Sequence, residues 1–224
     1  MTSLLFVLGT SAFAWTPAVR RWRPARSAEG TRASLLGVVS GSGTQTLVVL
    51  VLGLGFVFGF AEVAVPAWAT EEGAPELAGV LLGVWALAGV VFGVAYAARP
   101  WPRPLHVRAP VLLAVFSVLV ALTALAPSLL WLTVGLVVSG TLITPQSTLH
   151  SLLVERVAPE GAAAEAFGWV LTAVTLGVGI GQAVAGQIVE LASPHAALAL
   201  AAVPGLLGAL VVWLRRRTIA PSPS

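Results

Sequence analysis

Apolar residues gather in seven long runs that are separated by short polar gaps. The runs show no alternation of apolar and polar positions, and they are about twice as long as a spanning β-strand requires. Each is long enough, or nearly so, to cross about 30 Å of hydrocarbon as a helix. The pattern predicts an all-α, polytopic transmembrane bundle with seven spans, at residues 4–19, 47–68, 77–98, 109–126, 129–149, 164–191 and 196–214.

The first run differs from the other six. It is short, it ends near Pro17, and its basic residues follow it, whereas those of a secretory signal come first. We interpret residues 1–19 as a first transmembrane helix, short or truncated at its start. Residues 20–43 are basic and carry Ser and Gly, which indicates a linker at the membrane surface. A six-helix bundle over residues 44–214 and a tail over 215–224 complete the predicted organisation.

Charge divides the gaps into two sets. All twelve basic residues are Arg, and all lie in alternate gaps or in the tail, whereas Glu71, Glu72 and Glu76 lie in a gap of the opposite set. By the positive-inside rule the Arg-bearing gaps and the C-terminus are cytoplasmic. Together with the Arg-only, Ala/Gly/Val-rich usage, this favours a multi-pass protein of a bacterial cell membrane.

Composition excludes several classes of function. Hydrophobic residues make up 58% of the chain and charged residues 9%, against about a quarter in soluble domains. Asp, Lys and Cys are absent, which removes Asp-pair sites, a Schiff-base lysine and thiolate metal sites. The three His residues are assigned to gaps, so no predicted span offers a base for a serine nucleophile. We expect no enzyme, no cofactor, no metal and no nucleic-acid partner.

Glu62 is the sharpest candidate for function, because a carboxylate inside a span is costly. It shares a helix face with Gly55, Gly59 and Pro66. One interpretation is a proton- or cation-coupling carboxylate at the outer part of a cavity. The other is an acid near Trp68 that extends to the outer surface.

Other polar residues inside the spans are weaker candidates. Glu165 opens a face that continues through Thr172, Thr175 and Gln182, which suits either a water-filled path or tight packing. Gln146 follows Pro145, so it could contact a substrate or satisfy the carbonyl that the proline leaves free. Helix packing is predicted at glycines four residues apart, namely Gly55 and Gly59, Gly79 and Gly83, and Gly177 and Gly181.

The layout resembles the second half of the major facilitator superfamily. Residues 4–19 would match the last helix of the first half, 20–43 the central linker and 47–214 the second half. The family's motif of Gly, three residues, Asp and then basic residues is matched in part in the loop after the run 77–98, with Gly93 in place, Ala97 at the Asp position, and Arg99 and Arg103 as charges. The sixth span starts with Glu-Ala-Phe-Gly-Trp and continues with spaced glycines.

The resemblance implies a function. Family members move small solutes, often driven by protons, by rocking two halves about a midplane site. We expect a proton-coupled transporter half of the efflux type, a fragment or inactive alone, which works in the lipid bilayer with a small-molecule substrate and with a second six-helix half or a second copy. The alternative is a noncatalytic assembly protein that dimerises through its glycine faces.

Overall fold

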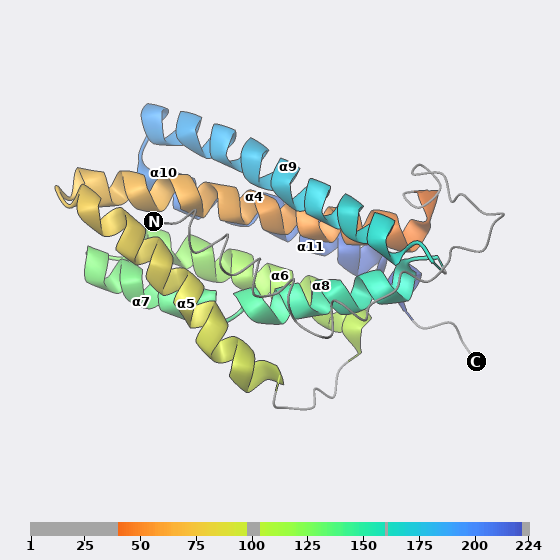
Figure 1. Cartoon of the computed structure of the whole chain (residues 1–224). Coiled ribbons are helices and arrows are strands. Elements are labelled where there is room, and N and C mark those ends of the chain that lie inside the picture. Colours follow the sequence, from red (N-terminus) through yellow and green to blue (C-terminus); the bar gives the residue numbers. More distant parts are fainter. Residues whose placement is uncertain (1–39, 98–103, 160, 221–224) are drawn as a thin grey trace, which may run out of the picture. The chain divides into compact units, whose positions relative to one another are not determined.

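The computed structural model describes residues 40–97, 104–159 and 161–220, all of which belong to one compact unit, residues 33–224. Within these residues every regular element is helical and no strand occurs, which confirms the predicted all-α class (Figure 1). Six helices or helix pairs are long and apolar enough to cross a membrane. The predicted first span lies outside the described residues, so the described part of the chain supports six spans rather than seven.

The six spans follow the predicted runs closely, with most helices extending a few residues into the polar gaps. Two spans end or begin with a 3₁₀ turn, and two are divided into a pair of helices. In chain order the elements are α4 (Ser42–Glu71), η1 (Pro75–Leu77), α5 (Ala78–Ala97), α6 (Leu105–Leu122), η2 (Thr123–Leu125), α7 (Leu129–Gly140), α8 (Ile143–Val157), α9 (Ala163–Leu191), α10 (Pro194–Leu200), α11 (Ala202–Leu214) and η3 (Arg216–Ile219).

Proline explains the break between α7 and α8. Pro145 has no N–H, so it cannot donate to the carbonyl of Thr141, four residues earlier. The helix is interrupted at this point, where the N–H of Leu142 donates to Ser139 at 3.1 Å, a tighter three-residue step. Helix α7 therefore ends at Gly140, and α8 begins at Ile143.

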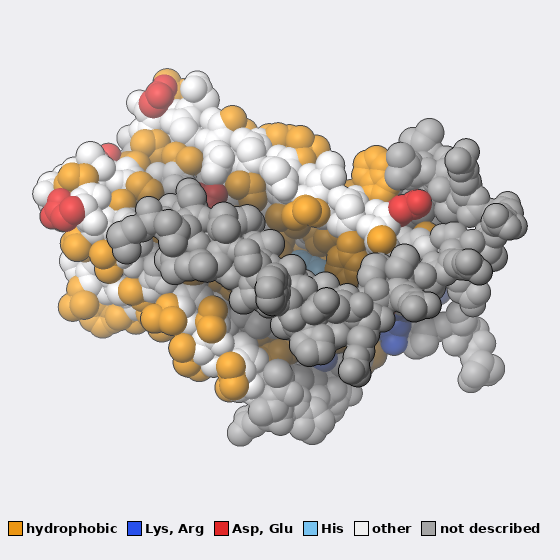
Figure 2. Space-filling view, viewed as in Figure 1, with side chains coloured by type: hydrophobic (Ala, Val, Ile, Leu, Met, Phe, Trp, Pro, Cys, Tyr) orange, Lys and Arg blue, Asp and Glu red, His pale blue; other side chains and the backbone are white. Residues whose placement is uncertain are grey.

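The surface of the unit is strongly apolar. Large aliphatic side chains lie exposed on most spans, with Val94 and Leu130 each 72% exposed, and Figure 2 shows hydrophobic side chains along the length of the face in view. A soluble monomer rarely exposes so much contiguous apolar surface. The exposed side chains are suited to contact with lipid.

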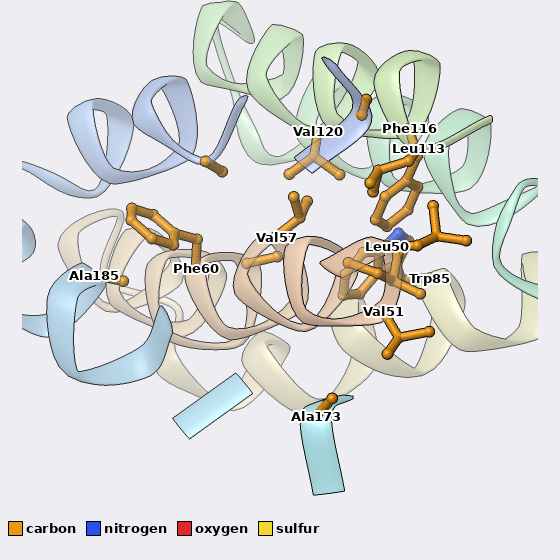
Figure 3. Close-up of a cluster of buried hydrophobic side chains, with 14 of the residues drawn as sticks. Leu50, Val51, Val57, Phe60, Trp85, Leu113, Phe116, Val120, Ala173 and Ala185 are labelled. Atoms are coloured by element: carbon orange, nitrogen blue, oxygen red, sulfur yellow. The ribbon is translucent and has the colours of Figure 1, made fainter. Parts of the chain in front are cut away.

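Helix α4 is the centre of the bundle. Its most apolar 18-residue stretch is 61% buried, whereas that of α9 is 22% buried. Helix α4 packs against α5, α6, α8, α9, α10 and α11. In Figure 3, Val57 of α4 and Val120 of α6 point toward one another. Toward α6 the helix also presents Phe58, whose ring centroid lies 5.4 Å from that of Phe116.

Four glycines bring α4 and α9 into backbone contact. A Cβ placed on Gly177 would lie 3.1 Å from the Cα of Gly55, and one on Gly181 would lie 3.3 Å from the Cα of Gly59. Both contacts advance by four residues in the same direction, so the two helices run parallel. This small-residue stripe is the close-packing device that helices use in bilayers.

The other predicted glycine pair has no neighbour among the described helices. Gly79 and Gly83 are exposed on α5, and no described atom lies within 4 Å of a Cβ built on either one. The close contacts of α5 come instead from Gly89 and Gly93, which approach Ile143 and Thr144 of α8. Four-residue spacing identifies a smooth face, but it does not say whether a neighbouring helix covers that face.

The start of the predicted tail packs onto one end of the bundle. We call this end, which carries Arg215, Arg216 and Arg217, the arginine end. Arg215 donates to Gln45 Oε1 at 3.0 Å, and the hydroxyls of Thr46 and Thr218 lie 2.8 Å apart. Ile219 is 1% exposed. The chain as far as η3 therefore belongs to the bundle. The opposite end, with Glu71, Glu72 and Glu76, is the glutamate end.

A matched pair of Gly→Ala changes tests the backbone contact. At Gly59 a Cβ would collide with the carbonyl oxygen of Val178, so Gly59→Ala is expected to destabilise the chain by about 1–3 kcal/mol. Gly83→Ala, in open space, is expected to be neutral or to stabilise by up to about 1 kcal/mol through helix propensity. Unfolding in detergent micelles followed by circular dichroism measures both, and equal effects would contradict the packing described.

Candidate functional site

Two candidate residues from different spans meet across the α4–α9 contact. The amide Nε2 of Gln182 donates a hydrogen bond to Glu62 Oε2 at 2.7 Å, although the residues are 120 positions apart. Both side chains are exposed at the edge of the contact. The glycine register produces the meeting, because Glu62 follows Gly59 by three residues and Gln182 directly follows Gly181.

Proline adds a second oxygen to this site. Helix α4 continues through Pro66, which cannot donate to the carbonyl four residues earlier, and that carbonyl belongs to Glu62. Glu62 therefore presents a carboxylate and a backbone carbonyl that lacks its helical donor. Nine residues separate Glu62 from the end of α4 at Glu71, about 14 Å at the helical rise.

The polar stripe of α9 is exposed rather than packed. The hydroxyls of Thr172 and Thr175 donate to carbonyls of their own helix at 2.8 and 2.9 Å. No described atom lies within 4 Å of a Cβ built on Gly168 or Gly179 on the same face. Within the described residues this stripe is therefore an open polar face that no other helix covers.

Glu165 lies far from the Glu62 pair. It precedes Gln182 by 17 residues on the same helix, a separation of about 26 Å. Its side chain is half-buried, and its Oε2 atom is buried without a hydrogen-bond partner. The structure thus brings Glu62 and Gln182 together and leaves Glu165 outside the site.

Helix α8 carries a buried candidate and a residue that the sequence analysis misplaced. Gln146 is 1% exposed, and neither atom of its amide has a hydrogen-bond partner, so it does not satisfy a carbonyl freed by Pro145. His150 was assigned to a gap, but it lies inside α8 and is 7% exposed. The apolar run ends at Leu149, whereas the helix continues to Val157.

A stripe of exposed hydroxyls on α8 was not predicted. Ser147, Thr148 and Ser151 each donate to the carbonyl four residues earlier, at 3.0 to 3.1 Å. Satisfying these hydroxyls within the helix lowers the cost of facing lipid or a cavity. Their three- and four-residue spacing was visible in the sequence and would have indicated a polar helix face.

The chemistry that the site offers is that of a carboxylate paired with an amide. Among the described residues, no group of three or more His, Cys, Asp or Glu side chains could hold a metal ion. A carboxylate with an amide donor can take up a proton and exchange its hydrogen-bonding role from acceptor to donor.

Comparisons with family models, with curated proteins and with solved structures return no match. The class of the protein is therefore given by the fold alone. The described chain is a polytopic α-helical membrane protein with six spans.

A double-mutant cycle tests the pair. Glu62→Ala, Gln182→Ala and the double variant are expected to show a coupling of about 0.5–1.5 kcal/mol in unfolding free energy, the range for hydrogen bonds between membrane helices. Glu62→Ala combined with Thr175→Ala is the control, because the Thr175 hydroxyl bonds only within α9. Its coupling is expected to be near zero, and equal couplings in the two cycles would contradict a specific bond.

Proposed function

We propose that this chain forms half of a membrane transporter for a small solute, with the Glu62–Gln182 pair as the point of proton or cation coupling. The observation that supports this proposal most is the pair itself. The carboxylate lies inside a span, its side chain is exposed beside the α4–α9 contact, and an amide from another span donates to it. Carboxylates at such depth are costly, and they commonly mark proton or ion paths.

Protonation would change the link between the two helices. The ionised carboxylate of Glu62 accepts from the Gln182 N–H. The protonated carboxyl is a weaker acceptor and gains an O–H donor, which favours the amide oxygen of Gln182 instead. A proton at Glu62 therefore rearranges a bond that spans α4 and α9, and the carbonyl of Glu62, to which Pro66 cannot donate, is a further acceptor close by.

The exposed polar faces of α8 and α9 support a solute path beside this pair. Thr172 and Thr175 on α9, with Ser147 and Thr148 on α8, form open polar faces on spans that are otherwise apolar. A second six-helix half, or a second copy, would enclose such a path, as the resemblance to the major facilitator superfamily suggests. By the positive-inside rule the arginine end faces the bacterial cytoplasm. The resemblance to the family favours efflux as the direction of transport.

The exposed glycines of α5 favour a second candidate. Gly79 and Gly83 lie four residues apart on an open face, a pattern through which membrane helices dimerise. A noncatalytic assembly protein would use this face and would not require Glu62 as an acid. The two candidates therefore differ in their response to Glu62→Gln.

Reconstitution into proteoliposomes tests the transport proposal. The purified chain, as a monomer, is expected to give no flux of a sugar and drug panel under an imposed pH gradient, and flux is expected when it assembles with a second half or with itself. In the active assembly, Glu62→Gln is expected to abolish gradient-driven flux, whereas Thr133→Ala, on α7 outside the proposed path, is expected to retain it. Flux by the monomer would refute the half-transporter proposal, and unchanged pH-driven flux in Glu62→Gln would refute the coupling role.

A further inference from the structure

Three buried polar atoms lie together on one face of α8. Gln146 and His150 are four residues apart, which places their side chains one turn from each other on the same side of the helix. They are 1% and 7% exposed. Gln146 Nε2, Gln146 Oε1 and His150 Nε2 have no hydrogen-bond partner among the described residues.

The polar side chains next to these two residues on α8, and the indole of Trp85 on α5, already have hydrogen bonds. Thr144 donates to the carbonyl of Gly89 at 2.5 Å, and Trp85 donates to Ser139 at 3.1 Å. Ser147 and Ser151 bond within α8. Buried polar atoms in folded proteins nearly always have a partner, so three orphaned atoms on adjacent turns indicate a bound group that the described side chains do not supply.

The surroundings limit the charge of that group. Helix α8 packs against α4, α5, α6, α9 and η3. On these elements and on α8 itself the charged side chains lie in the first or last turns. The exception is Glu62, which lies in the half of α4 nearer the glutamate end. An ion held among the buried leucines of α8 would have no counter-charge to offset its desolvation free energy. A neutral ligand avoids this cost.

We infer that Gln146 and His150 bind one neutral hydroxyl-type group inside the bundle, either an ordered water molecule or a hydroxyl of a polar solute. A hydroxyl both donates and accepts, so it can pair with the amide of Gln146 and with Nε2 of His150 in either neutral tautomer. Buried waters typically bind groups that are otherwise unsatisfied. The site goes beyond the proposed transport function, because it would exist whether or not the chain carries a solute.

Solid-state NMR of the full chain in lipid bilayers tests this site. The chain has three His residues, so ¹⁵N-histidine labelling gives few signals, and His150→Gln assigns the one of interest. Magnetisation transfer from water is expected to reach His150 Nε2. The transfer is expected to fall to background in Gln146→Leu and to persist in Thr148→Val, a matched control on the exposed face of α8 whose hydroxyl bonds Thr144.

A panel of neutral polyols and sugars separates the two sources. If one of them abolishes the water transfer in a saturable way, the bound group is a solute hydroxyl. If no member of the panel alters the transfer, the bound group is ordered water. Either result supports the site. Absence of transfer in the wild type, or transfer that Gln146→Leu leaves unchanged, overturns it, as does a direct Gln146–His150 hydrogen bond. Unchanged His106 and His195 signals show that each variant is folded. Flux measurements decide the transport function separately.

Discussion

The structure depends on the close approach of α4 and α9 at four glycines. Lipid is as apolar as the helices, so burial of apolar area does not drive two helices together in a bilayer, and contact between backbones must contribute instead. Gly55, Gly59, Gly177 and Gly181 permit that contact and set its register. The register is what places a carboxylate opposite an amide, so the candidate site is a consequence of packing between residues that carry no side chain.

The six spans could be predicted because run length and the lack of alternation are strong signals in a chain that must satisfy its backbone internally. Packing faces were harder to predict. Gly55 and Gly177 meet across an interface, whereas Gly79 and Gly83 have the same spacing and meet no described neighbour. In a soluble protein the polar face would mark the side toward solvent. In a bilayer both faces of α5 are apolar, so the sequence lacks the contrast that would distinguish them.

The two polar sites show a second limit of prediction. Glu62 and Gln182 were each recognisable as polar residues in apolar spans, but their pairing requires the register between helices that are separated by 120 positions. His150 was misplaced for a different reason. It follows the last apolar residue of its run, and the helix continues past that run to Val157 because backbone hydrogen bonds, not apolar side chains, define it. Hydropathy reports where lipid contact ends, not where the helix ends.

The unequal burial of the two paired helices decides which of them can respond to a change at Glu62. Helix α4 interlocks with α6 through large side chains such as Leu113 and Phe116, each fully buried, so displacing α4 would disturb a packed core. Helix α9 is the less buried of the two, and among the described residues its most extensive contact is the one with α4, where the glycines of both helices meet. If proton uptake alters the Glu62–Gln182 bond, α9 is the element that can slide or tilt at low cost. Its exposed polar stripe, with Thr172 and Thr175, would then move relative to the fixed face of α8.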